Sequence, residues 1–177
     1  MIRLRFIGDR IRLTGLHFFN FQFKIMVLDF IKSLFGGKTN QNETKVFYDS
    51  RLGKLTCEFD RKSEEFFFWN AILTNINNDK FETTITIEGD VNSPNSGLLD
   101  SAYKIIDNLS SITADVQNGL NGKYPEKSID LSKGYVLDDI SFYADDEVEY
   151  EMEFTSDDQE MVSVSFKNNS ITELDLY

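Results

Sequence analysis

Residues 147–154 read EVEYEMEF, with Glu at every second position and Val, Tyr, Met and Phe between. Because successive side chains of a strand point to opposite faces of a sheet, this alternation predicts a half-buried β-strand. Its solvent face would carry a row of four carboxylates, Glu147, Glu149, Glu151 and Glu153. Glu is a poor strand former, so four of them on one strand indicate a requirement other than strand propensity.

Two interpretations of this acidic row remain open. Alternate strand residues lie about 7 Å apart, and at that distance two charges in water repel by only about 0.6 kcal/mol. The row could therefore serve solubility and protect an edge strand from aggregation. It could equally form an anionic surface that docks onto a cationic protein groove. Four further acids flank the strand and favour this second interpretation: Asp145, Asp146, Asp157 and Asp158.

Strand-like alternation recurs on both sides of one helical segment. Before it, KVFYD and KLTCEFD predict a hairpin, FFFWNAIL a buried strand and FETTITIEGD a fourth strand. After it, three or four antiparallel strands are predicted by VLDDISFYAD, EVEYEMEFTS, MVSVSFKNN and SITELDLY.

The segment between these strand sets has helical periodicity. Apolar residues recur at three- and four-residue steps from Leu98 to Leu120, which predicts one long amphipathic helix with Asn95 or Ser96 as its N-cap. Helices are too few for alternating βαβ units. The predicted class is therefore α+β: an antiparallel β-meander, one long helix packed on a sheet face, and a second antiparallel strand set.

The first 25 residues differ in charge from the rest of the chain. They hold five basic side chains against Asp9, a net of +4, so that residues 26–177 carry −16 and the whole chain −12. They have neither the cleavage site of a signal peptide nor the apolar length of a membrane span. We interpret residues 1–25 as a doubtful leader and residues 26–177 as a single domain that starts at Met26 with an amphipathic helix. The alternative is that IRLRFIG is a genuine extra strand.

Composition limits the classes of partner. The chain has 177 residues, of which 41% are hydrophobic and 16 are Phe, so that it can bury a substantial core as one domain. A net charge of −12 would repel nucleic-acid phosphates and an anionic membrane surface. We therefore expect no nucleic acid and no membrane among the partners. A basic protein remains as the charged partner.

The residues that most catalytic and metal sites need are nearly missing. His17 is the only histidine and Cys57 the only cysteine, so His-based catalysis and zinc clusters are not expected. Three Asp doublets, at 138–139, 145–146 and 157–158, lack the spacing of an EF-hand loop. We expect no enzyme, no catalytic residues, no cofactor and no metal site. A single cysteine also fits a reducing cytoplasm.

Part of the chain resembles a group of small acidic bacterial proteins of unknown function. The resemblance covers roughly residues 47–109 and is carried by YDSRLGKLTCEFD, a strand containing Trp69, ITIEGD and the helix start SGLLDSAYKIIDNL. In that group an Asp-x-x-Leu/Phe-Gly-x-Leu hairpin precedes a Trp-containing strand and an amphipathic helix. Such proteins are often similar to immunity proteins encoded beside secreted bacterial toxins. The resemblance implies an inhibitor and no catalytic residues.

Together these features predict a non-enzymatic, cytoplasmic protein-binding domain. It would be an immunity-like inhibitor that neutralises a basic partner, such as a secreted nuclease toxin, by covering its active cleft. Nucleases need positive clefts, which an acidic surface complements. The expected partner-binding residues are the Glu row and its four flanking Asp residues. The alternative is a structural or regulatory single-domain protein whose acidity serves solubility only, and the sequence leaves the oligomeric state open.

Residues 1–25 are predicted to be dispensable for folding. A chain that starts at Met26 should unfold cooperatively and within a few degrees of the full chain, because its core would not include the leader. Thermal unfolding followed by circular dichroism checks this. Loss of a cooperative transition would instead identify IRLRFIG as a core strand.

Overall fold

The computed structural model describes residues 5–7, 10–12, 42–60, 67–76, 81–144 and 148–177. The chain divides into two compact units, residues 1–41 and 42–177. In the first unit, β1 (Arg5–Ile7) and β2 (Arg10–Arg12) pair as an antiparallel two-stranded sheet. The amphipathic helix predicted after Met26 lies outside the described residues.

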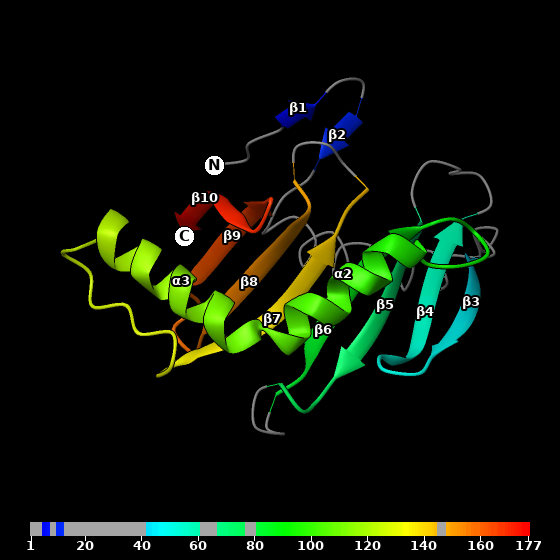
Figure 1. Ribbon diagram of the computed structural model, residues 1–177, viewed down its shortest axis with the longest axis horizontal. Helices are drawn as coiled ribbons and strands as arrows, with labels where there is room; N and C mark the ends of the chain where they lie inside the picture. Colours follow the sequence, from blue (N-terminus) through cyan, green and yellow to red (C-terminus); the bar gives the residue numbers. More distant parts are fainter. Residues whose placement is uncertain (1–4, 8–9, 13–41, 61–66, 77–80, 145–147) are drawn as a thin grey trace, which may run out of the picture. The chain divides into compact units, whose positions relative to one another are not determined.

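Eight strands of the second unit form one sheet (Figure 1). Their order across the sheet follows the chain, from β3 at one edge to β10 at the other. The strands are β3 (Asn42–Asp49), β4 (Gly53–Asp60), β5 (Phe67–Leu73), β6 (Thr83–Gly89), β7 (Tyr135–Phe142), β8 (Tyr150–Ser156), β9 (Met161–Lys167) and β10 (Ser170–Leu176).

A parallel pairing of β6 with β7 joins the two strand sets. Ile85 lies opposite Ile140 and Ile87 opposite Phe142, whereas the other neighbours in this sheet are antiparallel. The predicted α+β fold with two separate strand sets is therefore wrong, because the structure is dominated by a single sheet. Alternation fixes which face a strand buries, but it does not show which strands of different sets become neighbours.

The predicted single long helix is also wrong, because two helices occupy that segment: α2 (Ser96–Asp107) and α3 (Leu109–Lys123). The N-cap is Asn95, whose Oδ1 accepts from the backbone N–H groups of Gly97 at 2.9 Å and Leu98 at 3.3 Å. The break is at Asn108, with φ −111° and ψ 12° and with Nδ2 donating to the Lys104 carbonyl at 2.8 Å. An Asn side chain competes in this way with the helix backbone.

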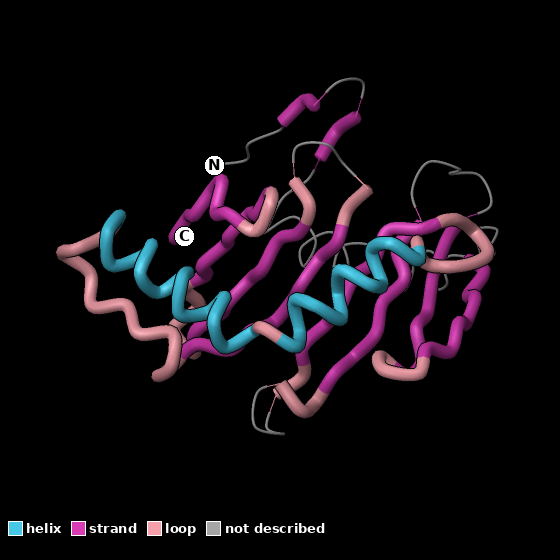
Figure 2. The backbone as a smooth tube through the Cα atoms, in the orientation of Figure 1, coloured by secondary structure: helices cyan, strands magenta, loops and turns pink. Residues whose placement is uncertain are grey.

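The core lies between the two helices and one face of the sheet, here called the helix face. Figure 2 shows both helices on the same side of the strands. The helices contribute five buried residues, Leu99, Ala102, Ile105, Val116 and Leu120. At the centre of the sheet, Tyr150 stacks between Phe142 and Phe166, with ring centroids 5.8 and 4.4 Å apart. These three rings come from adjacent strands and are buried.

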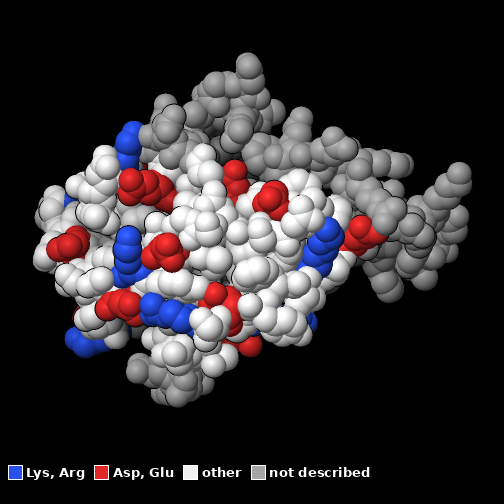
Figure 3. All heavy atoms as spheres, turned by 45° about the vertical axis from the view of Figure 1, so that its right-hand side comes forward, with Lys and Arg blue, Asp and Glu red and all other residues white. Residues whose placement is uncertain are grey.

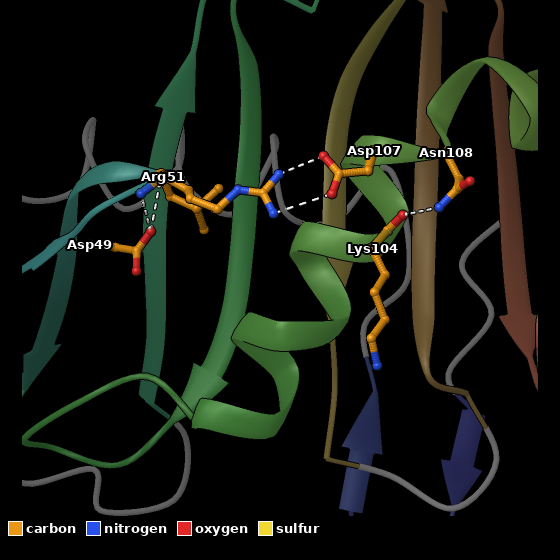
Figure 4. A network of polar contacts seen from close by, with 6 residues as sticks. Asp49, Arg51, Lys104, Asp107 and Asn108 are labelled. Atoms are coloured by element: carbon orange, nitrogen blue, oxygen red, sulfur yellow. Dashed lines mark hydrogen bonds and ion pairs between the residues drawn. The ribbon is translucent and has the colours of Figure 1, made fainter.

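The turn between β3 and β4 is tied to α2 by polar contacts (Figure 4). Asp49 Oδ1 accepts from the backbone N–H groups of Arg51 at 2.8 Å and Leu52 at 2.7 Å. Tyr103 of α2 donates its hydroxyl hydrogen to the other oxygen, Oδ2. The Arg51 guanidinium binds both carboxylate oxygens of Asp107, at 3.2 and 2.5 Å. It also lies over the Tyr103 ring, with Cζ 4.6 Å from the ring centroid. Bidentate pairing of this kind fixes orientation as well as distance.

A tight loop after β6 positions the start of α2. Gly89 pairs with Pro94 as an isolated bridge, and the Asn95 N–H donates to the Glu88 carbonyl at 3.1 Å. The buried Trp69 donates its Nε1 hydrogen to the carbonyl oxygen of Asp90 at 3.0 Å. The loop therefore approaches β6 closely, and a glycine is required at position 89 because a Cβ there would lie 2.4 Å from the Ser93 carbonyl oxygen.

Gly89→Ala is expected to lower the free energy of unfolding by about 1–3 kcal/mol, because the added methyl group meets rigid backbone on Ser93 and Pro94. Gly122→Ala is the control: it lies in α3 with nothing within 4 Å of its Cβ, and it should raise stability by up to about 1 kcal/mol. Urea denaturation of both variants measures the difference. Equal effects of the two changes would contradict the close approach at Gly89.

Candidate functional site

The face of the sheet opposite the helix face is polar in its middle, and we call it the polar face. Strand register places Asp139 directly opposite Glu153, and Ser141 directly opposite Glu151. On the other sides of these pairs, Glu153 faces Ser163 and Glu151 faces Ser165. The central carboxylates, Asp139, Glu151 and Glu153, therefore lie on two adjacent strands and are here called the acid cluster.

The predicted alternation of β8 is confirmed. Tyr150, Met152 and Phe154 are buried on the helix face, while Glu151 and Glu153 lie between them on the other face. However, β8 lies between β7 and β9 and is not an edge strand. Protection of a sheet edge therefore does not explain the Glu row.

Hydrogen bonds hold two of the clustered carboxylates in place. Asp139 Oδ2 accepts from the Ser141 hydroxyl at 2.5 Å, and its Oδ1 shares the single Thr86 hydroxyl hydrogen with Asn70 Oδ1, at 3.2 and 3.0 Å from Thr86 Oγ1. Glu151 Oε1 accepts from Ser165 at 3.0 Å, and its Oε2 accepts from the Tyr143 hydroxyl at 3.1 Å. Glu151 is thus oriented by two hydroxyl donors, and Asp139 by Ser141 and by its share of the Thr86 hydroxyl.

Two carboxyl groups of the acid cluster have raised pKa values. Burial raises the pKa of Asp139 to about 6, although hydrogen bonds from Ser141 and Thr86 act in the opposite direction. Burial raises the pKa of Glu153 to about 7, and the charges of Asp139 and Glu151 add to the rise. Removal from water and like charges both disfavour an ionised carboxylate. The Glu row is therefore not a freely hydrated surface.

No Lys or Arg of the described residues forms an ion pair with the acid cluster. Ion pairs among the described residues join Arg51 to Asp107, Lys123 to Asp175 and Lys133 to Asp130, and none of these includes an acid-cluster residue. The described residues also contain no group of three His, Cys, Asp or Glu side chains arranged to hold a metal ion. On the surface seen in Figure 3, by contrast, basic and acidic side chains lie next to one another.

The structure brings together only part of the predicted partner-binding set. One side of β8 carries Glu151 and Glu153, and Glu149 lies immediately before the strand. Glu149 is exposed and accepts a hydrogen bond from the Asn168 N–H at 3.0 Å. Asp157 and Asp158 are exposed in the turn between β8 and β9, beyond the end of the row. The remaining three predicted residues, Asp145, Asp146 and Glu147, lie outside the described residues.

Asp139 belongs to the cluster but was not predicted to bind a partner. The sequence shows it only as half of an Asp doublet, and a register shift between Leu137 and Asp139 interrupts the alternation that would have revealed its face. The hydroxyl donors Thr86, Ser141 and Ser165 are buried and carry no sequence motif. Their roles depend on which strands become neighbours.

The residues that carry the resemblance to immunity-like proteins have structural roles here. Asp49 and Gly53 form the β3–β4 turn, in which Gly53 has φ 75°, and Trp69 is in the core. Cys57 is buried, and burial raises the pKa of its thiol. No helix among the described residues has the length and apolar character needed to cross a membrane. No protein-family model matches the chain, and neither does any curated protein or solved structure.

The acid cluster predicts an unusual pH dependence of stability. For Asp139 and Glu153 the pKa is higher in the folded than in the unfolded chain, against ordinary values of 3.8 and 4.5. The folded state therefore binds more protons between about pH 4 and 7, and stability should fall as pH rises through that window. Urea denaturation should show a gain on the order of 2 kcal/mol on moving from pH 8 to pH 5.

Asp139→Asn combined with Glu153→Gln removes both titrating groups, so the variant should lose most of this pH dependence. The exposed pair Asp157→Asn and Asp158→Asn is the matched control and should retain it. A wild-type chain that is less stable at pH 5 than at pH 8 would contradict the assignment.

Proposed function

We propose that the protein is a non-enzymatic, cytoplasmic, acidic protein-binding domain that acts as an immunity-like inhibitor. It would bind a basic protein, such as a secreted bacterial nuclease toxin, and cover the active cleft of that protein. The observation that supports this proposal is the acid cluster: Asp139, Glu151 and Glu153 lie together in the middle of a sheet without a cation from the described residues.

The isolated protein bears an electrostatic cost at this cluster. Asp139 and Glu153 are directly opposite each other on β7 and β8, where like charges destabilise a strand pair. Both are also partly removed from water, which raises the free energy of their ionised forms. A Lys or Arg side chain from a partner would offset both effects. Such a cost in the free protein favours association with a cation-bearing surface.

The geometry of the cluster suits a preformed binding surface. Glu151 accepts two hydroxyl hydrogen bonds, and Asp139 accepts one from Ser141 and shares that of Thr86, so that their oxygens are oriented before a partner arrives. Fixing side chains in advance reduces the entropy lost on binding. A nuclease cleft is positively charged because it must hold phosphates, and a field of opposite sign accelerates its encounter with an acidic surface.

Solubility alone accounts less well for this arrangement. Acids that serve only solubility can remain fully hydrated on turns, as Asp157 and Asp158 do. Glu153 is instead half-buried on an interior strand, and the described residues provide no hydrogen-bond donor to its carboxylate. The partner class follows from charge and position, and the inhibitory role from the resemblance over residues 47–109.

The test takes any secreted nuclease domain encoded beside the gene of this chain and measures its binding to the chain and the inhibition of its activity. A gene neighbourhood without a basic toxin domain would count against the proposal. Glu149→Lys combined with Glu153→Lys should lower the association rate constant by about tenfold or more, because complementary charge acts mainly on encounter. The dependence of that rate on salt should also flatten. Biosensor kinetics at several salt concentrations and a nuclease assay provide the two readouts.

The matched control is Asp100→Lys combined with Glu126→Lys, which changes the net charge equally at exposed positions on α2 and after α3. This variant should associate at nearly the wild-type rate. Equal losses in both variants would show that only net charge matters, and a wild-type chain that neither binds nor inhibits the nuclease would refute the proposal.

A further inference from the structure

The two edges of the eight-stranded sheet differ in how they are protected. β10 has a register shift between Ile171 and Glu173, and Lys123 of α3 donates to the carbonyl oxygen of Leu174 and to Asp175 Oδ1. A bulge and a covering helix are both devices that stop a sheet edge from accepting another strand. The β10 edge is therefore closed by its own chain.

Neither device is found at β3 among the residues that the structure describes. β3 pairs with β4 over eight consecutive residue pairs without a register shift, and it contains no proline. Two of its apolar side chains are exposed on the polar-face side, Val46 at 45% and Tyr48 at 78%. A long, regular edge strand with exposed apolar side chains offers backbone N–H and C=O groups to a further strand.

We infer that β3 pairs antiparallel with β3 of a second copy of this chain, around a two-fold axis at Phe47, so that the two sheets continue into one. The inference does not rest on the proposed function. A two-fold axis perpendicular to the sheet brings matching faces together, so each residue faces a residue on the same side of its own sheet.

Charge selects this register among those that the two-fold axis allows. With the two-fold axis at Phe47, Lys45 lies opposite Asp49 of the second copy and Val46 lies opposite Tyr48. The symmetry makes each of these pairs occur twice. These are an opposite-charge pair and an aromatic–β-branched pair, both of which stabilise cross-strand neighbours.

The neighbouring registers bring like charges together. If the two-fold axis passes through Lys45, Lys45 faces Lys45 of the second copy. If the axis passes through Val46, Glu43 faces Asp49 of the second copy. Centred on Tyr48, Lys45 faces Arg51. Like charges directly opposite each other destabilise a strand pair. A centre at Thr44 leaves Tyr48 outside the pairing and joins only the first residues of the strand.

The Asp49 carboxylate is prepared for its role in this pairing. It is held by the Arg51 and Leu52 N–H groups and by the Tyr103 hydroxyl. Burial alone would raise its pKa, but these hydrogen bonds outweigh burial and keep the pKa below its usual value, so that the group is ionised at neutral pH. The self-pairing also leaves the acid cluster free, because it extends the sheet sideways from the strand farthest from β10.

The first experiment measures the self-association of the full chain by sedimentation equilibrium over a wide range of concentrations. The wild type should form a dimer. Val46→Lys and Lys45→Glu should each raise the dimer dissociation constant by at least about tenfold, equivalent to about 1.4 kcal/mol. Each substitution is present in both copies and therefore alters two cross-strand pairs. Ile72→Lys is the control, because Ile72 is 59% exposed on the same face but lies two strands inside the edge.

The second experiment tests the register without relying on the stability of a charged variant. Val46→Cys and Tyr48→Cys chains, mixed under mild oxidation, should form a disulfide-linked heterodimer, whereas either alone should crosslink poorly because like positions are diagonal to one another. The native Cys57 is buried and is not expected to react. Three results would overturn the inference. The wild-type chain could stay monomeric at all concentrations, or the Ile72→Lys variant could dissociate as readily as Val46→Lys. The third result is that Val46→Cys alone crosslinks as efficiently as the mixture.

Discussion

The parallel pairing of β6 with β7 is the contact that makes one sheet out of two strand sets. Each set is a chain-ordered meander, and without this contact β6 and β7 would each be an edge strand with unpaired backbone groups. Joining them places Ile85 beside Ile140 and Ile87 beside Phe142, so that one continuous apolar surface covers the helix face. Helices α2 and α3 form the crossover that parallel neighbours require, and they bury their apolar sides on the same surface. The break at Asn108 leaves both helices on that face.

The same pairing adds a hydroxyl donor to the acid cluster on the other side, which the pairing of β7 with β8 assembles. Once β7 is next to β6, the Thr86 hydroxyl is close enough to donate to Asp139, and β8 then brings Glu153 opposite Asp139. Burial therefore has opposite effects on the free energy of the side chains on the helix face and on the polar face. Burial stabilises the apolar residues of the first, whereas it raises the free energy of ionised carboxylates on the second. A basic partner would lower that free energy, which links the fold to the proposed function.

The sheet also leaves its two edges in different states. α3 reaches β10, where Lys123 at its end contacts the backbone carbonyl of Leu174 and the Asp175 carboxylate. At the β3 edge, the described residues show contacts from α2 to the β3–β4 turn, through Asp49, Arg51 and Tyr103. A dimer formed through β3 would present two acid clusters on the same side of a continuous sheet. Two linked binding surfaces raise avidity when a partner can engage both.

Local patterns determined much of this protein. Period-two alternation placed Tyr150, Met152 and Phe154 in the core and Glu151 and Glu153 opposite them. The hairpin around Gly53 followed from its turn, and Asn95 was one of the two predicted helix caps. Contacts between distant segments were decided only by the folded chain. The single sheet, the break at Asn108, the interior position of β8 and the inclusion of Asp139 in the acid cluster all depend on which strands become neighbours. Side-chain periodicity records the face that each element buries, whereas strand order depends on the packing energy of the whole core, which no short stretch of sequence contains.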